Sequence, residues 1–247
     1  MNIVCIGSKG SAVTTTALAL AGGWSTATSP VVMVEADAAG GDVAARFDLP
    51  TSPSLLTAAA SLQQPTVGLL LEHTHTLPGG LRVLPAPLRS VEVAGGMNDF
   101  TRAVIAPMRG SHDVNLIIDA GRCDVRTIPS LTLHADIVVV IVRQEHRSAQ
   151  ATVGRCLHAQ QVVETLASRG MPMVAVVVGD SPYKADEIGQ FLGLPVIGVL
   201  SEDPHGASHL AGRSATSRSA RRSHLAKSAA TLADKLAAEL TRALVPA

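Results

Sequence analysis

Short apolar runs rich in Val and Ile recur along the chain, and each is followed by a segment with helical character. Several runs, such as IVVVIV at 137–142, contain no polar residue, which is typical of strands covered on both faces. Strands are expected at residues 2–6, 31–35, 81–84, 114–118, 137–142, 173–178 and 196–200, and helices at 15–24, 54–62, 99–108, 148–168 and 184–192. This alternation predicts an α/β fold with a mostly parallel central sheet and helices on both faces, a doubly wound domain.

We find no internal repeat, and the polar stretches 63–80 and 85–96 are interpreted as connections within one domain spanning 1–247. Its last part, 213–247, is expected to form a basic loop and a helix that Ser223 caps. The apolar residues of this helix fall on one face and are expected to pack against the sheet; they are Leu225, Ala229, Leu232, Leu236, Leu240 and Leu244.

Composition narrows the class of protein. Aromatic residues are only 2% of a chain that is 47% hydrophobic, so Ala, Val, Leu and Ile must build the core. Lys plus Arg and Asp plus Glu both number 20, which leaves no net field to attract nucleic acid or a membrane. The sequence shows neither an apolar stretch of the ~18–20 residues that a membrane span requires nor a secretory signal. Three separated cysteines (Cys5, Cys123 and Cys156) without a CxxC pair fit a reducing compartment, so we expect a cytoplasmic protein with Cys5 in its core.

Polar residues gather where the expected strands end. Residues 8–16 follow the first strand, Glu35 and Asp37 end the second, and Asp119 and Asp180 end two later ones. In parallel sheets of this kind ligands bind beyond the carboxyl ends of the strands. We therefore expect the functional site at this edge.

The stretch IVCIGSKGSAVTTTALAL at 3–20 has the layout of a strand, a phosphate-binding loop and a helix. It resembles the MinD/ParA group of P-loop ATPases, whose deviant Walker A loop reads K-G-G-x-G-K-[ST]-[ST]. The residues over this pattern are Lys9, Gly10, Ser11, Ala12, Val13, Thr14, Thr15 and Thr16. The resemblance implies a P-loop NTPase-like fold, ATP and Mg²⁺ as ligands, Thr15 as a magnesium ligand, and Lys9 reaching the partner's nucleotide across a homodimer.

The loop departs from the family pattern at three positions. Ser11 and Val13 replace glycines, and Thr14 replaces the main lysine. A β-branched residue resists positive φ, so a glycine-dependent backbone at Val13 must be rearranged. Losing several charge-assisted contacts would weaken triphosphate binding on the order of a hundredfold or more, unless Lys9 or an arginine compensates. Threonine at that position and the TTTALALA continuation resemble the CpaE/TadZ-type pilus localisation relatives. The alternative is an ordinary strand-to-helix turn with Thr14 or Thr15 as N-cap.

Two further motifs resemble the same family in the same order. VVMVEADAAGGD resembles its second motif, which implies that Asp37 positions magnesium or the attacking water and that Glu35 supports it or links to the loop. NLIIDAGR resembles its Walker B strand, which implies that Asp119 holds the water shell of the magnesium ion. Arg122 is a candidate for replacing the missing lysine charge; the alternative is an ion pair with Asp119 or Asp124. Asp180 is a candidate acceptor for an adenine amino group, and the backbone near 202–204 for lining the base.

Three other features are considered as binding sites: an arginine cluster, the C-terminal helix and two histidine pairs. The arginines Arg213, Arg218, Arg221 and Arg222 could contact DNA phosphates as in ParA relatives, but they lack an aromatic platform, and a solvated loop is the interpretation we favour. Membrane contact by the C-terminal helix is not expected, because its stripe is alanine-rich and its polar face carries acids. The pairs His73/His75 and His205/His209 lack the further ligands of a zinc site.

The combined interpretation is a MinD/ParA-like domain with a lysine-deficient phosphate loop. By this resemblance it would act as a spatial organiser that helps to position a chromosome, a septum or a pilus or secretion apparatus. By resemblance it would form a homodimer, bind an unidentified protein partner or cargo, bind ATP weakly, and be at most a slow Mg-dependent ATPase. The alternative is a nucleotide-independent scaffold that keeps only the fold and the interaction surface.

Overall fold

A mostly parallel sheet forms the centre of the computed structural model, which describes residues 1–247 except 26, 63–64, 123–127, 213–221 and 245–247. Within the described residues the strands are β1 (Asn2–Gly7), β2 (Val31–Glu35), β3 (His75–Thr76), β4 (Arg82–Leu84), β5 (Asn115–Arg122), β6 (Ile137–Arg143), β7 (Met173–Val178) and β8 (Val196–Leu200). Their order is β3-β4-β2-β5-β1-β6-β7-β8, and only the β3–β4 pair among them is antiparallel. The predicted α/β class and mostly parallel sheet are confirmed.

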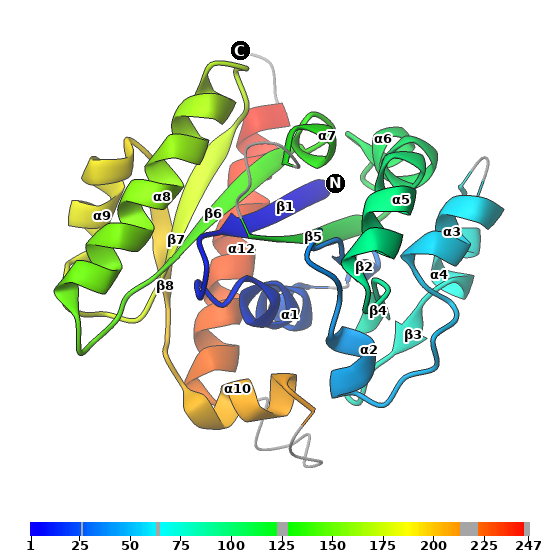
Figure 1. Cartoon of the computed structure of the whole chain (residues 1–247), viewed down its shortest axis with the longest axis horizontal. Helices are drawn as coiled ribbons and strands as arrows, with labels where there is room; N and C mark the ends of the chain where they lie inside the picture. Colours follow the sequence, from blue (N-terminus) through cyan, green and yellow to red (C-terminus); the bar gives the residue numbers. More distant parts are fainter. Residues whose placement is uncertain (26, 63–64, 123–127, 213–221, 245–247) are drawn as a thin grey trace.

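Helices cover both faces of the sheet (Figure 1). They are α1 (Val13–Gly23), α2 (Val43–Arg46), α3 (Leu55–Ser61), α4 (Val67–Glu72), α5 (Ser90–Phe100), a π-helical turn at Thr101–Ile105, α6 (Ala106–Met108), α7 (Ile128–Thr132), α8 (Ala149–Ala167), α9 (Ala185–Leu192), α10 (Pro204–Leu210) and α12 (His224–Leu244). One face packs against α1 and α12, and the other against α3, α5, α8 and α9. A hydrophobic core lies on each face of the sheet. Alternate residues of the central strands point into one core or the other, as expected of strands covered on both faces.

The two stretches interpreted as connections are partly regular structure. Residues 63–80 contain α4 and β3, and 85–96 contain the first turns of α5, elements that the sequence did not predict. The start of α5 was not predicted because the helix contains two glycines, and glycine disfavours helices. Packing explains one of them: a Cβ on Gly96 would lie 2.0 Å from Leu56 Cδ2 of α3. Tertiary contact therefore overrides the local preference.

The C-terminal helix α12 packs against the sheet as predicted. Its stripe residues Leu225, Ala229, Leu232, Leu236 and Leu240 are all buried, and the side chain of Leu244 lies outside the described residues. Ser223 caps the helix through its Oγ, which accepts from Ala226 N–H at 3.1 Å. In the part of the chain that the structure describes, no helix is both long and apolar enough to cross a membrane.

Candidate functional site

The loop between β1 and α1 turns tightly and is closed by its own serines. Gly10 and Ala12 adopt positive φ, 77° and 59°. The Ser8 and Ser11 hydroxyl groups lie 2.8 Å apart, and Ser11 N–H donates to Ser8 O at 3.0 Å. Gly7 has no room for a side chain, because an added Cβ would lie 2.8 Å from Ser11 Cβ. The loop is therefore a compact turn whose shape depends on small residues.

The helix begins at Val13, two residues earlier than predicted. Ala12 is the N-cap, so the alternative that Thr14 or Thr15 caps α1 is wrong. Val13 needs no positive φ, because it already belongs to the helix and Ala12 takes the left-handed conformation. Ala12 has no side-chain acceptor for the N–H groups in the first turn of α1. N–H groups of a helix's first turn have no partner within the helix, and such groups favour an anion.

Asp119 is the most buried acid of the site. It does not end β5 as expected, since the strand runs on to Arg122. Its side chain is fully buried, and burial, with the charges of Glu35 and Asp37, raises its pKa to about 7. The hydroxyl group of Thr14 and the N–H of Gly121, which donates to Oδ1 at 2.9 Å, act in the opposite direction.

The second oxygen of Asp119, Oδ2, has no partner that satisfies strict hydrogen-bond geometry. Thr14 therefore lies near enough to lower the pKa of Asp119, but it does not fully satisfy the carboxyl group. A buried polar atom without a partner is uncommon in native proteins, and it often marks a functional site. The position that usually holds the phosphate-loop lysine thus carries a hydroxyl group beside an incompletely paired acid.

Asp37 reaches the same place from the end of β2. Its carboxyl group lies against the backbone of Gly121, where an added Cβ would stand 2.0 Å from Asp37 Cγ. Burial raises the pKa of Asp37, while the Ala39 N–H, which donates to Oδ1 at 2.8 Å, and the charge of Arg122 lower it. Arg122 is exposed and exerts its charge on Asp37. Asp124, the other predicted partner of Arg122, lies outside the described residues.

Glu35 holds the segments around Asp37 in place. Its Oε1 accepts from Asp42 N–H at 2.7 Å and Val43 N–H at 3.1 Å, and its Oε2 accepts from Ala86 N–H at 3.0 Å. Both oxygens are thus used within the protein. Burial raises the pKa of Glu35, and these three hydrogen bonds lower it. Of the two predicted roles, support of the neighbouring Asp37 segment agrees with these contacts.

Several predicted residues are not joined to this cluster by any described contact. Lys9 and Asp180 are exposed, and Thr15 is half-buried. Thr16 is fully buried, and its Oγ1 lacks a partner. Their roles stay predictions. The predicted DNA-contacting residues Arg213, Arg218 and Arg221 lie outside the described residues, and Arg222 is exposed.

The segment 202–204, which was expected to line the adenine base, makes contacts within the protein. Glu202 pairs with Arg143 of β6. Asp203 accepts from His205 N–H at 3.0 Å and Gly206 N–H at 2.9 Å, which caps α10 and lowers the pKa of Asp203. Across the described ranges, no group of three or more His, Cys, Asp or Glu side chains is arranged to hold a metal ion. The His205 and His209 rings pack edge to face, 5.0 Å apart.

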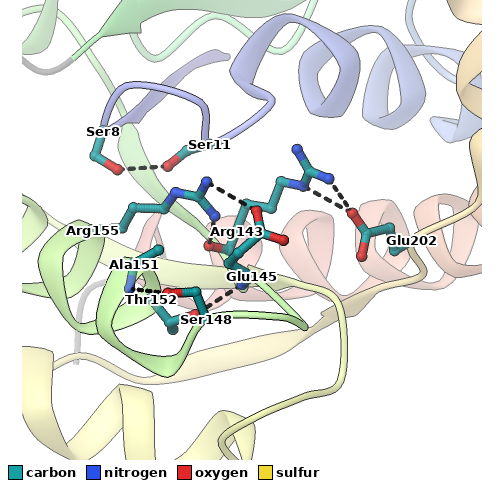
Figure 2. A network of polar contacts seen from close by, with 9 residues as sticks. All are labelled: Ser8, Ser11, Arg143, Glu145, Ser148, Ala151, Thr152, Arg155 and Glu202. Atoms are coloured by element: carbon teal, nitrogen blue, oxygen red, sulfur yellow. Dashed lines mark hydrogen bonds and ion pairs between the residues drawn. The ribbon is translucent and has the colours of Figure 1, made fainter.

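The sequence did not mark Arg155, a residue of α8 that borders the loop. A Cβ added to Gly10 would lie 3.6 Å from Arg155 Nη2. Figure 2 shows the guanidinium group beside Ser8 and Ser11. Only the packing of α8 next to the loop brings these groups together, so no local pattern could have predicted the contact.

No protein-family model and no curated protein sequence matches the chain. Solved structures do. A ParA family ATPase from Chlorobium tepidum is 14% identical with a TM-score of 0.71, over 94% of this chain and 98% of that one. The cell division ATPase MinD of Pyrococcus furiosus is 17% identical with a TM-score of 0.71, over 96% and 99%. The septum site-determining protein MinD of Pyrococcus horikoshii is 19% identical with a TM-score of 0.69, over 97% and 99%. The chain therefore has the fold of the MinD and ParA ATPases, as its sequence motifs predicted.

Proposed function

We propose that the chain binds Mg-ATP, weakly and with little hydrolysis, at the loop 8–16 and acts as a spatial organiser of the MinD/ParA kind. The observation that carries this proposal is the fully buried carboxyl group of Asp119, whose Oδ2 lacks a partner beside the first turn of α1. An unpaired buried acid next to an uncapped helix start fits a site for a cation and an anion together.

The residues present fit such a ligand. The loop backbone and the start of α1 would hold the phosphates. Thr15, Asp37 and Asp119 would hold magnesium and its waters, since Mg²⁺ binds one or two carboxylates together with phosphate oxygens. The ion supplies charge neutralisation at the phosphates. The MinD structure of P. horikoshii contains Mg-ADP, which supports the same ligand class here.

The organising role rests on the fold and on the names of its structural relatives. They include a ParA family ATPase and a septum site-determining protein MinD, and another structure is a MinC:MinD cell division protein complex. We propose a homodimer in which exposed Lys9 acts toward the partner's nucleotide, together with a protein partner or cargo. The resemblance of the TTTALALA stretch favours a pilus or secretion apparatus as the cargo.

One observation favours the second candidate, a scaffold that needs no nucleotide. Thr14 stands where a lysine would neutralise phosphate, and its hydroxyl group interacts with Asp119 instead. The Ser8–Ser11 contact likewise closes the loop on itself. If the protein is a scaffold, the buried acids and the turn stabilise the fold and thereby its interaction surface.

Calorimetric titration of Mg-ATP separates the two functions. Micromolar binding by the wild type that is lost in Asp119→Ala supports the nucleotide switch. No heat in the wild type, with binding gained in Thr14→Lys, supports the scaffold. Thermal unfolding of each variant in the absence of ligand checks that its fold is intact.

A further inference from the structure

Arg155 presents a guanidinium group to the middle of the phosphate loop. It comes from α8, which follows β6, and β6 lies beside β1 in the sheet. Its Nη2 would be 3.6 Å from a Cβ on Gly10. Gly10 has no side chain, so nothing of that residue stands between the guanidinium group and the loop backbone.

Within the part of the chain that the structure describes, few contacts hold the guanidinium group, and they leave it able to gain another. Nη1 donates to Arg143 O at 2.9 Å, and Nη2 lies 3.5 Å from Glu145 Oε2. That ion pair is long, and the Glu145 side chain is 34% exposed. Arg155 itself is only 17% exposed. A guanidinium group with a distant, partly solvated partner can transfer to a better anion at small cost.

The turn that carries these partners is well fixed. Glu145 N–H donates to Thr152 Oγ1 at 2.8 Å, and Ser148 Oγ accepts from Ala151 N–H at 3.2 Å. Figure 2 shows this network on the side of Arg155 away from Ser8 and Ser11. Arg155 is thus aimed at the loop by a rigid support, which a binding residue requires.

Two other cations of the region have different partners. Arg143 donates from Nε and Nη2 to Glu202 Oε1. Arg122 exerts its charge on Asp37. Arg155 is the cation that the described contacts place against the loop backbone itself.

We infer that Arg155 supplies the positive charge that is missing because Thr14 occupies the position of the phosphate-loop lysine. Its guanidinium group leaves Glu145 and binds an oxygen of a polyphosphate held by the loop 8–16. The inference rests on the proposed nucleotide binding and adds the residue that makes it possible. Arginine suits this role, because its planar fork can bond two phosphate oxygens at once.

The test is calorimetric titration of Mg-ATP and Mg-ADP into the full-length protein. Arg155→Ala is expected to weaken Mg-ATP binding roughly 10- to 100-fold, the loss of one charge-assisted contact. Arg155→Lys should lose less, because the charge stays. Arg147→Ala, which removes an exposed arginine of the same turn, is the matched control and should bind as the wild type does.

Glu145→Gln separates binding from mere support. If Arg155 only braces the turn through Glu145, this variant should weaken binding as Arg155→Ala does. If Arg155 binds phosphate, Glu145→Gln frees the guanidinium group, and affinity should hold or rise. The double variant Thr14→Lys/Arg155→Ala should regain affinity, since the lysine restores the missing charge.

The outcomes distinguish this inference from the function on which it rests. Wild-type binding that Arg155→Ala leaves unchanged overturns the inference and keeps the proposed function. A wild type that binds neither nucleotide, with binding gained in Thr14→Lys, overturns both. Equal losses in Arg155→Ala and Glu145→Gln overturn the inference alone.

Discussion

Gly121 of β5 lies against the carboxyl group of Asp37, so close that one added carbon would stand 2.0 Å from Asp37 Cγ. The same glycine donates its N–H to Asp119 Oδ1 and has φ +64°. One residue thus makes room for the first acid and bonds the second. This arrangement brings together two carboxyl groups that lie 82 positions apart in the sequence (119 − 37).

We expect Gly121→Ala to destabilise the protein and to displace Asp37. A left-handed conformation costs a non-glycine residue roughly 1–2 kcal/mol, and the clash adds to that cost. Gly110→Ala is the matched control, because Gly110 has a similar φ of +69° and open space around its Cβ position. Urea unfolding should show a larger loss of unfolding free energy for Gly121→Ala. Equal losses would mean that Asp37 moves aside freely.

The raised pKa of Asp119 predicts a pH-dependent stability. The ordinary pKa of Asp119 is 3.8 and its pKa in the folded protein is about 7. At pH values between these two, the folded state therefore binds more protons than the unfolded state. Stability conferred by the protonated acid should therefore fall as pH rises, by up to roughly 4 kcal/mol between about pH 4 and pH 7.

Urea unfolding from pH 4 to pH 8 measures this slope. Asp119→Asn keeps the shape without the charge and should flatten the slope, becoming more stable than the wild type at pH 8. Glu35 and Asp37, whose pKa values are also raised, should leave a smaller residual slope in the same direction. Identical pH profiles of wild type and variant would show that Asp119 ionises freely when buried.

The fold was predictable because the strands are unbroken apolar runs. The bounds of β2, β7 and β8 were predicted without error. The approach of Asp37 to Asp119 was expected from their strands, although β5 runs three residues beyond Asp119. The contacts of Thr14 and Arg155 were not predictable. They depend on how α1 and α8 sit relative to β5 and the loop, which no local pattern encodes. The start of α5 was missed for a related reason. Gly96 disfavours its own helix, and the side chain of Leu56 in α3 occupies the space where a Cβ of residue 96 would lie.

The hydroxyl group of Thr14 should tune the acid beside it. Because this group lowers the pKa of Asp119, Thr14→Val, which keeps the shape and removes the hydroxyl group, should raise that pKa further. Carbon-13 NMR titration of the Asp119 carboxyl group measures the effect. Thr15→Val is the control, since the causes that shift the pKa of Asp119 do not include Thr15. A shift of equal size in both variants would assign the effect to the helix start rather than to the Thr14 hydroxyl group.

Two adjacent glycines at the end of α1 should respond in opposite directions to alanine. A Cβ on Gly23 would lie 2.8 Å from Ala230 N, so Gly23→Ala forces α1 and α12 apart and should destabilise the protein by roughly 1–3 kcal/mol, a typical overpacking cost. Gly22 has nothing within 4 Å of its Cβ position. Gly22→Ala should therefore stabilise by up to roughly 1 kcal/mol through helix propensity. Thermal unfolding of both variants decides the matter: a tolerated Gly23→Ala would mean that α12 is held loosely against α1.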